Sequence, residues 1–205
     1  MTPIGRVQNS FSREHNFSAG LGYYPSKGFL SFNYTFDKRR YGIPVNPEEV
    51  DPEIVYLNPR RHSFEFKGGF RDNAGFLESG TLSAQYNDYT HSEIDSLTNQ
   101  PNTTFSNKSF LFQGIFDQRK RGRLSGKLGF WGQHRDFSAT GEEALAPPTK
   151  QKSFAMFGLE TLDFDKATLQ FGARLETNFY DPSVTARRGV LPSRRFTGFS
   201  AAAGV

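Results

Sequence analysis

Apolar and polar residues alternate along most of this chain. Between residues 29 and 38, the even positions from 30 to 36 carry Leu, Phe, Tyr and Phe, and the odd positions carry polar side chains. Between residues 167 and 176, the odd positions carry Ala, Leu, Phe, Ala and Leu. Because successive side chains of a β-strand point to opposite faces, this period of two predicts strands with one apolar and one polar face.

The alternation predicts about nine strands. They cover residues 15–24, 29–38, 64–70, 81–89, 110–116, 124–133, 155–159, 167–176 and 196–205. Ala155, Phe157 and Leu159 mark the apolar positions of the seventh of these segments. Glycine, proline, asparagine and charged residues predict tight turns at residues 25–28, 72–75, 119–122 and 163–166. Longer polar connections are expected at residues 39–61, 91–105, 138–151 and 180–195.

Short and long connections therefore alternate along the chain. Because successive connections of antiparallel neighbours fall on opposite rims, every short turn is expected on one rim and every long loop on the other. This sorting is typical of outer-membrane barrels, whose periplasmic turns are short and whose extracellular loops are long. We therefore predict an all-β fold, an antiparallel up-and-down transmembrane β-barrel segment over residues 1–205. A soluble β-sandwich gives a similar number of strands but has no reason to sort its loops.

Composition is compatible with such a segment. Only 36% of the 205 residues are hydrophobic, and no run reaches the roughly 18 apolar residues of a membrane helix. The 22 phenylalanines and 8 tyrosines suit strands and the aromatic girdles of a barrel. There is no cysteine, which excludes disulfides and zinc–thiolate sites.

The chain carries a formal net charge of +4, and its basic residues are clustered. The clusters are Lys38, Arg39 and Arg40; Arg60 and Arg61; Arg119, Lys120, Arg121 and Arg123; and Arg187, Arg188, Arg194 and Arg195. Such clusters raise nucleic-acid binding as a possibility. We favour solvated rims and strand ends instead, with arginines of the outer rim pairing with anionic lipid head groups, and expect no nucleic-acid partner.

Several segments resemble the barrel of TonB-dependent outer-membrane receptors. The strongest match is residues 133–149, QHRDFSATGEEALAPPT, which is similar to a segment of many members. Residues 154–157, 172–176 and 180–182 resemble the family's next hairpin, and residues 41–44, 89–93 and 104–107 add weaker likenesses.

The resemblance implies a receptor for a scarce nutrient, such as a metal chelate or siderophore, and no enzyme activity or cofactor. It implies an outer-membrane location with contacts to lipid and lipopolysaccharide, and uptake driven by the TonB complex through a plug domain. Because no plug, no signal peptide in residues 1–10 and no terminal aromatic residue is recognisable, we expect a fragment of a larger barrel. The alternatives are a small self-contained barrel with adhesive or scaffolding loops, and a secreted β-sandwich that binds protein or carbohydrate.

Two groups of residues are candidates for a site. His91, Glu93 and Asp95 alternate at the base of a long loop, where an imidazole and two carboxylates sharing a face would suit a metal ion or another ligand. The polar positions of the strands would face the lumen; they include Glu65, Lys67, Lys127, Gln133, Gln170, Arg174 and Glu176. Glu142 and Glu143 form a poor acid–base pair, because neighbours on a strand point to opposite faces.

Overall fold

The structure, a computed structural model, describes residues 5, 7–46, 48, 53–72, 74–141, 144–185 and 189–205. Within these residues the chain forms ten strands and no helix. The strands are β1 (Ser12–Tyr23), β2 (Gly28–Gly42), β3 (Val55–Leu57), β4 (Arg60–Arg71), β5 (Leu77–Asp95), β6 (Pro101–Gln118), β7 (Leu124–Gly141), β8 (Thr149–Phe164), β9 (Ala167–Pro182) and β10 (Arg194–Gly204). The described part of the chain has no helix able to cross a membrane.

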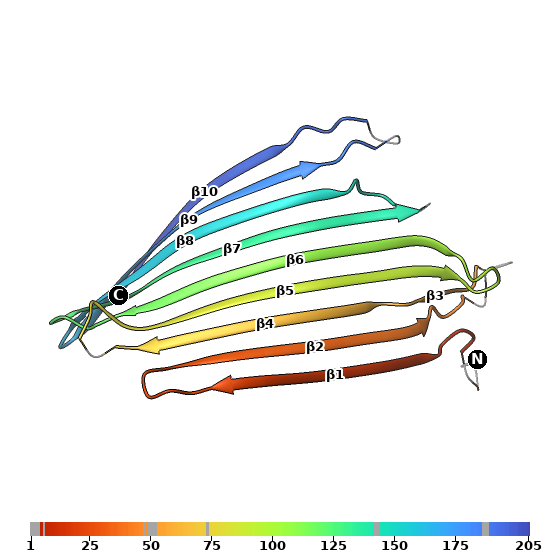
Figure 1. The fold of residues 1–205 in the computed structure, drawn as a ribbon. Coiled ribbons are helices and arrows are strands. Elements are labelled where there is room, and N and C mark those ends of the chain that lie inside the picture. The colour runs from red at the N-terminus through yellow and green to blue at the C-terminus, as the bar shows by residue number, and fades with distance from the viewer. Residues whose placement is uncertain are drawn as a thin grey trace.

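The strands form one curved antiparallel sheet in chain order (Figure 1). Hairpins join successive strands, while β3 and β4 lie one after the other between β2 and β5. β1 and β10 form the two edges of the sheet, on opposite sides of the ribbon in Figure 1. The prediction of an all-β antiparallel fold is confirmed. The expected number of strands was nearly right, since the tenth strand, β3, is a three-residue element inside the predicted connection 39–61.

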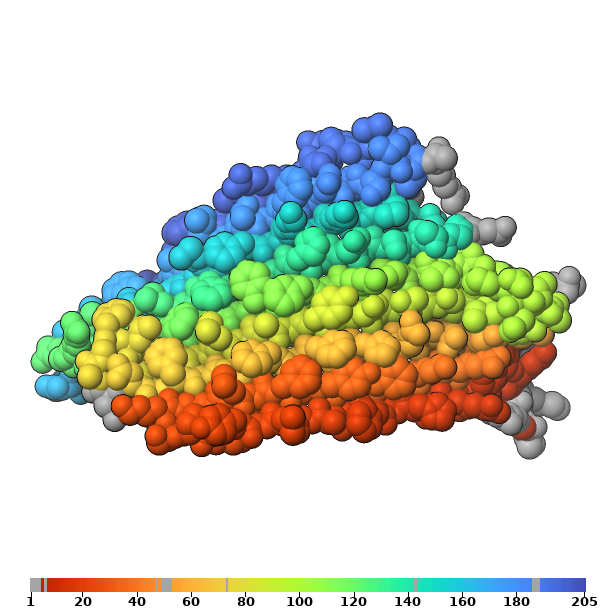
Figure 2. Space-filling model, viewed as in Figure 1, coloured from red at the N-terminus to blue at the C-terminus, as the bar shows by residue number. Residues whose placement is uncertain are grey.

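The sheet is a single layer, so the described residues bury very little apolar surface. Among them, only Tyr56, Ala139 and Ala155 are buried apolar side chains. Figure 2 shows one face of the sheet along its whole width, with no other element covering it. A sheet whose apolar face has no protein partner must find another apolar environment for that face.

Connections at the two rims differ in length within the described residues. The rim near residues 24–27, 72–76, 119–123 and 165–166 carries the tight turns, here called the short-turn rim. The opposite rim, here called the long-loop rim, carries the connections that follow β2, β5, β7 and β9; of these, the β5–β6 connection at residues 96–100 is a tight turn. At the short-turn rim, Asp72 accepts hydrogen bonds from the backbone amides of Ala74 and Gly75, as the turn chemistry predicted; Asn73 lies outside the described residues.

One predicted loop is wrong. Residues 91–105 form mostly strand, because β5 runs on to Asp95 and β6 begins at Pro101, leaving only residues 96–100 as a turn. His91 pairs with Phe105 and Glu93 with Thr103 across this extended hairpin. The segment is polar on both faces, so the apolar positions that mark a strand elsewhere are missing here although the backbone ladder continues.

Cross-strand register defines two faces. The apolar face carries most of the large exposed side chains in rows that cross the sheet, for example Leu30, Leu82, Phe130, Met156, Leu175 and Phe199. Exposure is high even in mid-strand: Met156 is 59% and Phe199 is 71% exposed. The opposite face, the polar face, carries Asn33, Glu65, Gln85, Gln133, Ser153 and Asn178 in a single row.

In β8, the residues predicted to form the apolar face lie on the polar face instead. Phe154 and Met156 of β8 share rows with Gly132 and Phe130 on the apolar face, so Ala155, Phe157 and Leu159 lie on the polar face. Both faces of β8 carry apolar residues, and alternation alone therefore did not distinguish them. Phe157 lies under the guanidinium of Arg174, 5.7 Å from its ring centre.

Towards the long-loop rim, the apolar face ends at a row in which basic and acidic residues alternate, here called the charge row. Its members are His62, Asp88, Lys108, Asp136, Lys150 and Asp181, each paired in register with the next. Lys108 and Asp88 are 4.0 Å apart. Opposite charges on facing strand positions stabilise a sheet by about 0.2–1 kcal/mol per pair.

Candidate functional site

All seven side chains predicted to face the lumen lie on the polar face by register. Lys67 and Glu65 pair with Ser83 and Gln85. The other five are Lys127, Gln133, Gln170, Arg174 and Glu176. The structure therefore brings these residues onto one surface, although it does not gather them at one point.

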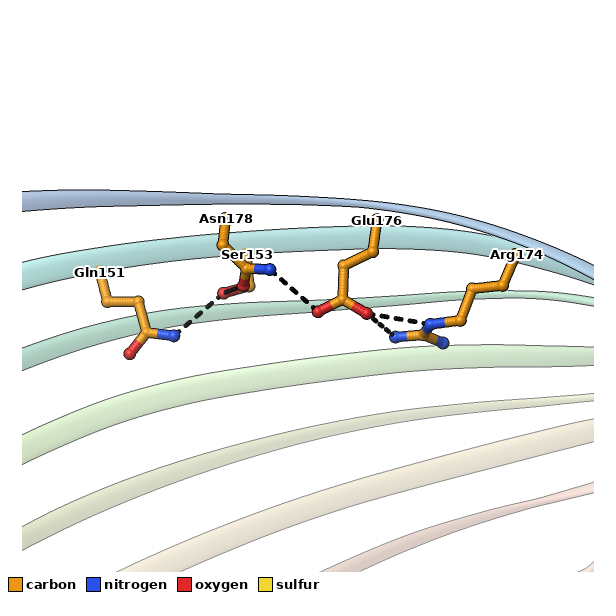
Figure 3. Close-up of polar contacts among 5 residues, drawn as sticks. All are labelled: Gln151, Ser153, Arg174, Glu176 and Asn178. Atoms are coloured by element: carbon orange, nitrogen blue, oxygen red, sulfur yellow. Dashed lines mark hydrogen bonds and ion pairs between the residues drawn. The ribbon is translucent and has the colours of Figure 1, made fainter. Parts of the chain in front are cut away.

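A hydrogen-bond network joins β8 and β9 on the polar face (Figure 3). Arg174 donates from Nε and Nη2 to the same oxygen of Glu176, at 2.9 and 2.6 Å. Asn178 donates to the other oxygen of Glu176 at 3.1 Å and accepts from Ser153 at 2.6 Å. Gln151 extends the chain by donating to Ser153 at 3.1 Å. Glu176 is thus held from both sides in one orientation.

A smaller network of the same residue types lies on β4 and β5. Ser63 donates to Asn87 at 2.7 Å, and Gln85 donates to both Ser63 and Asn87 at 3.2 and 3.3 Å. Nearby on β4, Lys67 and Glu65 are 3.8 Å apart. These parts of the polar face are therefore a surface of amides and hydroxyls that also carries ion pairs such as Lys67 with Glu65 and Arg174 with Glu176.

A hollow of the polar face near the short-turn rim has a volume of about 520 Å³. Asp117 lies at its wall and accepts hydrogen bonds from Ser79, at 2.5 Å, and from Lys127. Gln170 and Arg71 also line it. Two predicted residues, Lys127 and Gln170, thus share a concave polar site that offers donors, acceptors and paired charges to a polar ligand or protein segment.

Sequence reasoning missed Ser79 and Asp117 at this hollow. Both follow the polar alternation of their strands, so extending the polar register of residues 110–116 by one more position reaches Asp117. Their pairing depends on the register between β5 and β6, which shifts between Leu77 and Ser79. The sequence of one strand alone does not indicate that shift.

His91, Glu93 and Asp95, which were expected at the base of a long loop, lie at the end of β5. Asp95 forms the turn to β6: it accepts hydrogen bonds from the backbone amides of Leu97 and Thr98, at 2.9 and 2.6 Å. These bonds, those from Thr98 first, hold the pKa of the Asp95 carboxyl below its usual value.

The ring of His91 stacks on Phe105, with ring centres 4.5 Å apart. Its Nδ1 atom is buried and has no hydrogen-bond partner among the described residues. Burial disfavours the charged ring and lowers the pKa of His91. No cluster of three His, Cys, Asp or Glu side chains suited to a metal ion occurs within the described residues, so metal binding by this group stays a prediction.

The segment that carries the strongest family likeness spans the end of β7 and the start of β8. Gly141 ends β7 with a φ of 129°, and a Cβ there would lie 2.1 Å from the carbonyl oxygen of Asn102. Only glycine fits this position without strain. Glu142 and Glu143, which follow, lie outside the described residues, as do Arg187 and Arg188 of the basic cluster near residue 190.

Comparisons with known proteins add no relative. No family model matches the chain, and no curated protein matches it.

Proposed function

We propose that this chain forms part of the wall of a transmembrane β-barrel in the outer membrane, and that the barrel belongs to a TonB-dependent receptor. One observation carries the proposal: the apolar face is uncovered across the full width of the sheet, and the charge row borders it at the long-loop rim. In a barrel wall that face contacts lipid, and the polar face lines the interior.

The height of the apolar face fits a bilayer. On β9 its positions run from Leu169 to Phe179, which is about 33 Å along the strand at roughly 3.3 Å per residue. With the strand tilt of about 40° usual in such barrels, the vertical height is about 25 Å, the height of the apolar band of outer-membrane barrels. Asp181 of the charge row follows directly at the water interface.

The receptor assignment rests on the likeness of residues 133–149 to the family's barrel segment. The whole protein would bind a scarce nutrient, a metal chelate or siderophore, at its long-loop rim. The TonB complex would supply the energy through a plug domain.

Within that protein, the polar face has a defined role. The paired charges and amides of β8 and β9, with Glu176 at their centre, would contact the plug or the passing ligand. Hydrogen-bonded pairs that are already satisfied hold a partner weakly, which suits a surface past which a plug or a ligand must move.

Orientation is tested with single cysteines, because the chain has none of its own. Leu97→Cys lies in the β5–β6 turn at the long-loop rim, and Ser26→Cys lies in the β1–β2 turn at the short-turn rim. A membrane-impermeant maleimide should label L97C on intact cells. It should label S26C only after the outer membrane is permeabilised. Equal labelling of both in a protein of the aqueous fraction would instead support the secreted β-sandwich.

Transport is tested by uptake. Cells that lack this gene, and cells that lack TonB, should both fail to accumulate one member of a panel of radiolabelled iron chelates. If the orientation test succeeds but no member of the panel depends on the gene and on TonB, the self-contained adhesive barrel is the better account.

A further inference from the structure

Beyond the apolar face at one edge of the sheet lies a patch of basic residues. His15, Lys38 and Arg60 form one row across β1, β2 and β4, and Arg13 pairs with Arg40 in the next row towards the long-loop rim. By alternation these side chains lie on the same face as Phe17 and Phe36. Those two phenylalanines form the next row of that face towards the short-turn rim. We call these five basic residues the cationic patch.

Four of the five patch residues, all but Arg60, line a concave surface. A hollow of about 270 Å³ is lined by residues that include Arg13, His15, Lys38 and Arg40. Tyr56 forms one wall, and the guanidinium of Arg40 lies 4.0 Å from the centre of its ring. This cation–π contact uses the flat face of the guanidinium, so that the N–H groups at its edge can still bind an anion.

The carboxylates of β1 and β2 face the other way. Glu14 and Asp37 pair with Arg39, at 2.9 and 3.2 Å, on the polar face. None of the salt bridges of the described residues involves Arg13, Lys38, Arg40 or Arg60. The charge row, by contrast, alternates acid and base over β5 to β9. The excess of positive charge on the apolar side is thus confined to the β1, β2 and β4 edge.

We propose that the cationic patch binds the phosphate groups of an anionic lipid whose acyl chains lie on the apolar face beside it. Arginine matches phosphate with two parallel N–H donors, and lysine adds a point charge. A lipid is favoured over a soluble anion because the patch continues directly into Phe17 and Leu21, which are 56% and 80% exposed. A phosphate in the hollow would lie about 7 Å from the row of Phe17, which is the distance that two residues span along a strand.

This inference rests on the proposed membrane contact of the apolar face, and its test separates the two. The full-length protein is reconstituted with Phe36→Trp as a reporter beside the patch and Trp131→Phe to remove the native signal. Quenching of this tryptophan is compared between brominated phosphatidic acid and brominated phosphatidylcholine. Phosphatidic acid should be preferred by about tenfold or more, since each cation near a surface favours an anionic lipid about fivefold.

The variant R13Q/K38Q/R40Q should lose the preference. The matched control K27Q/K120Q/K166Q removes the same number of charges at the short-turn rim and should keep it. Inorganic phosphate added at the ionic strength of the assay buffer should leave the preference unchanged.

Three results would overturn the inference. Equal quenching by the two lipids would remove the phosphate site while leaving the membrane contact in place. Loss of the preference on adding inorganic phosphate would assign the patch to a soluble anion. Absence of quenching by either lipid would remove the inference together with the proposed membrane wall.

Discussion

Glu160 on β8 accepts a hydrogen bond from Gln118 on β6, two strands away. Gly126 of β7 lies between them, in register with Glu160. A Cβ at position 126 would lie 2.6 Å from the carboxyl oxygen of Glu160 and from the carbonyl oxygen of Leu159. The absence of a side chain on β7 is therefore what lets Glu160 reach Gln118.

Gly126→Ala should therefore destabilise the sheet by about 1–3 kcal/mol, the usual cost of adding a methyl group where backbone is in the way. Gly198→Ala is the matched control, because a Cβ there meets nothing within 4 Å. Urea unfolding in detergent, followed by the fluorescence of the single Trp131, measures both. Equal stability of the two variants would show that Glu160 reaches Gln118 by another path.

The charge row predicts that reversing the charge at position 136 destabilises the sheet, because Asp136 is flanked in register by Lys108 and Lys150. Asp136→Lys places like charges opposite both neighbours and should lower the free energy of unfolding by about 1–2 kcal/mol, the sum of two unfavourable pairs. The triple variant D136K/K150D/D181K makes the pairs 136/150 and 150/181 attractive again, leaves only the pair with Lys108 repulsive, and should recover part of the loss. The idea fails if the triple variant is less stable than D136K alone.

The pairing of Arg174 with Glu176 should contribute little by itself. Their side chains are 37% and 32% exposed, and partly exposed ion pairs contribute about 0.2–1 kcal/mol. A double-mutant cycle with R174A and E176A should therefore give a coupling energy in that range. E176A should cost more than R174A, since it also removes an acceptor of Asn178. A coupling above about 2 kcal/mol would mean that the pair is shielded from water in the whole protein.

His91 predicts a pH dependence of stability. Because burial lowers its pKa in the folded protein, the unfolded chain binds a proton first as pH falls through about 6.5, the usual value for histidine. The free energy of unfolding should therefore fall as pH decreases from about 7 towards the lowered pKa of the folded state, and the loss should end below it. His91→Phe keeps the stack on Phe105 and should remove this part of the slope. Identical slopes in urea titrations of the two proteins would contradict the burial of the ring.

The strands and faces were largely predictable, because period-two alternation is a local property. It succeeded where one face is apolar, as in residues 29–38, and failed where both faces are alike. Residues 91–105 are polar on both faces and were expected to form a loop, and β8 is apolar on both faces, so Phe157 was expected on the wrong one.

The candidate site was only half predictable. Which residues lie on the polar face follows from alternation, and all seven predicted positions lie there. Which of them meet depends on register between strands, as for Ser153 with Asn178 or Ser79 with Asp117. Register is set by pairing along whole hairpins and by bulges, and one strand does not encode it.

The central claim is that one face of the sheet contacts lipid and the other contacts water, and Phe130 and Trp131 test it most directly. These neighbours on β7 lie on opposite faces, Phe130 in register with Met156 and Trp131 with Ala155. In vesicles of brominated phosphatidylcholine, the variant F130W/W131F should be strongly quenched by lipid and protected from aqueous iodide. The native protein, with Trp131, should be little quenched by lipid. Equal behaviour of the two proteins, or quenching of both by iodide alone, would contradict the account of this chain as a membrane wall.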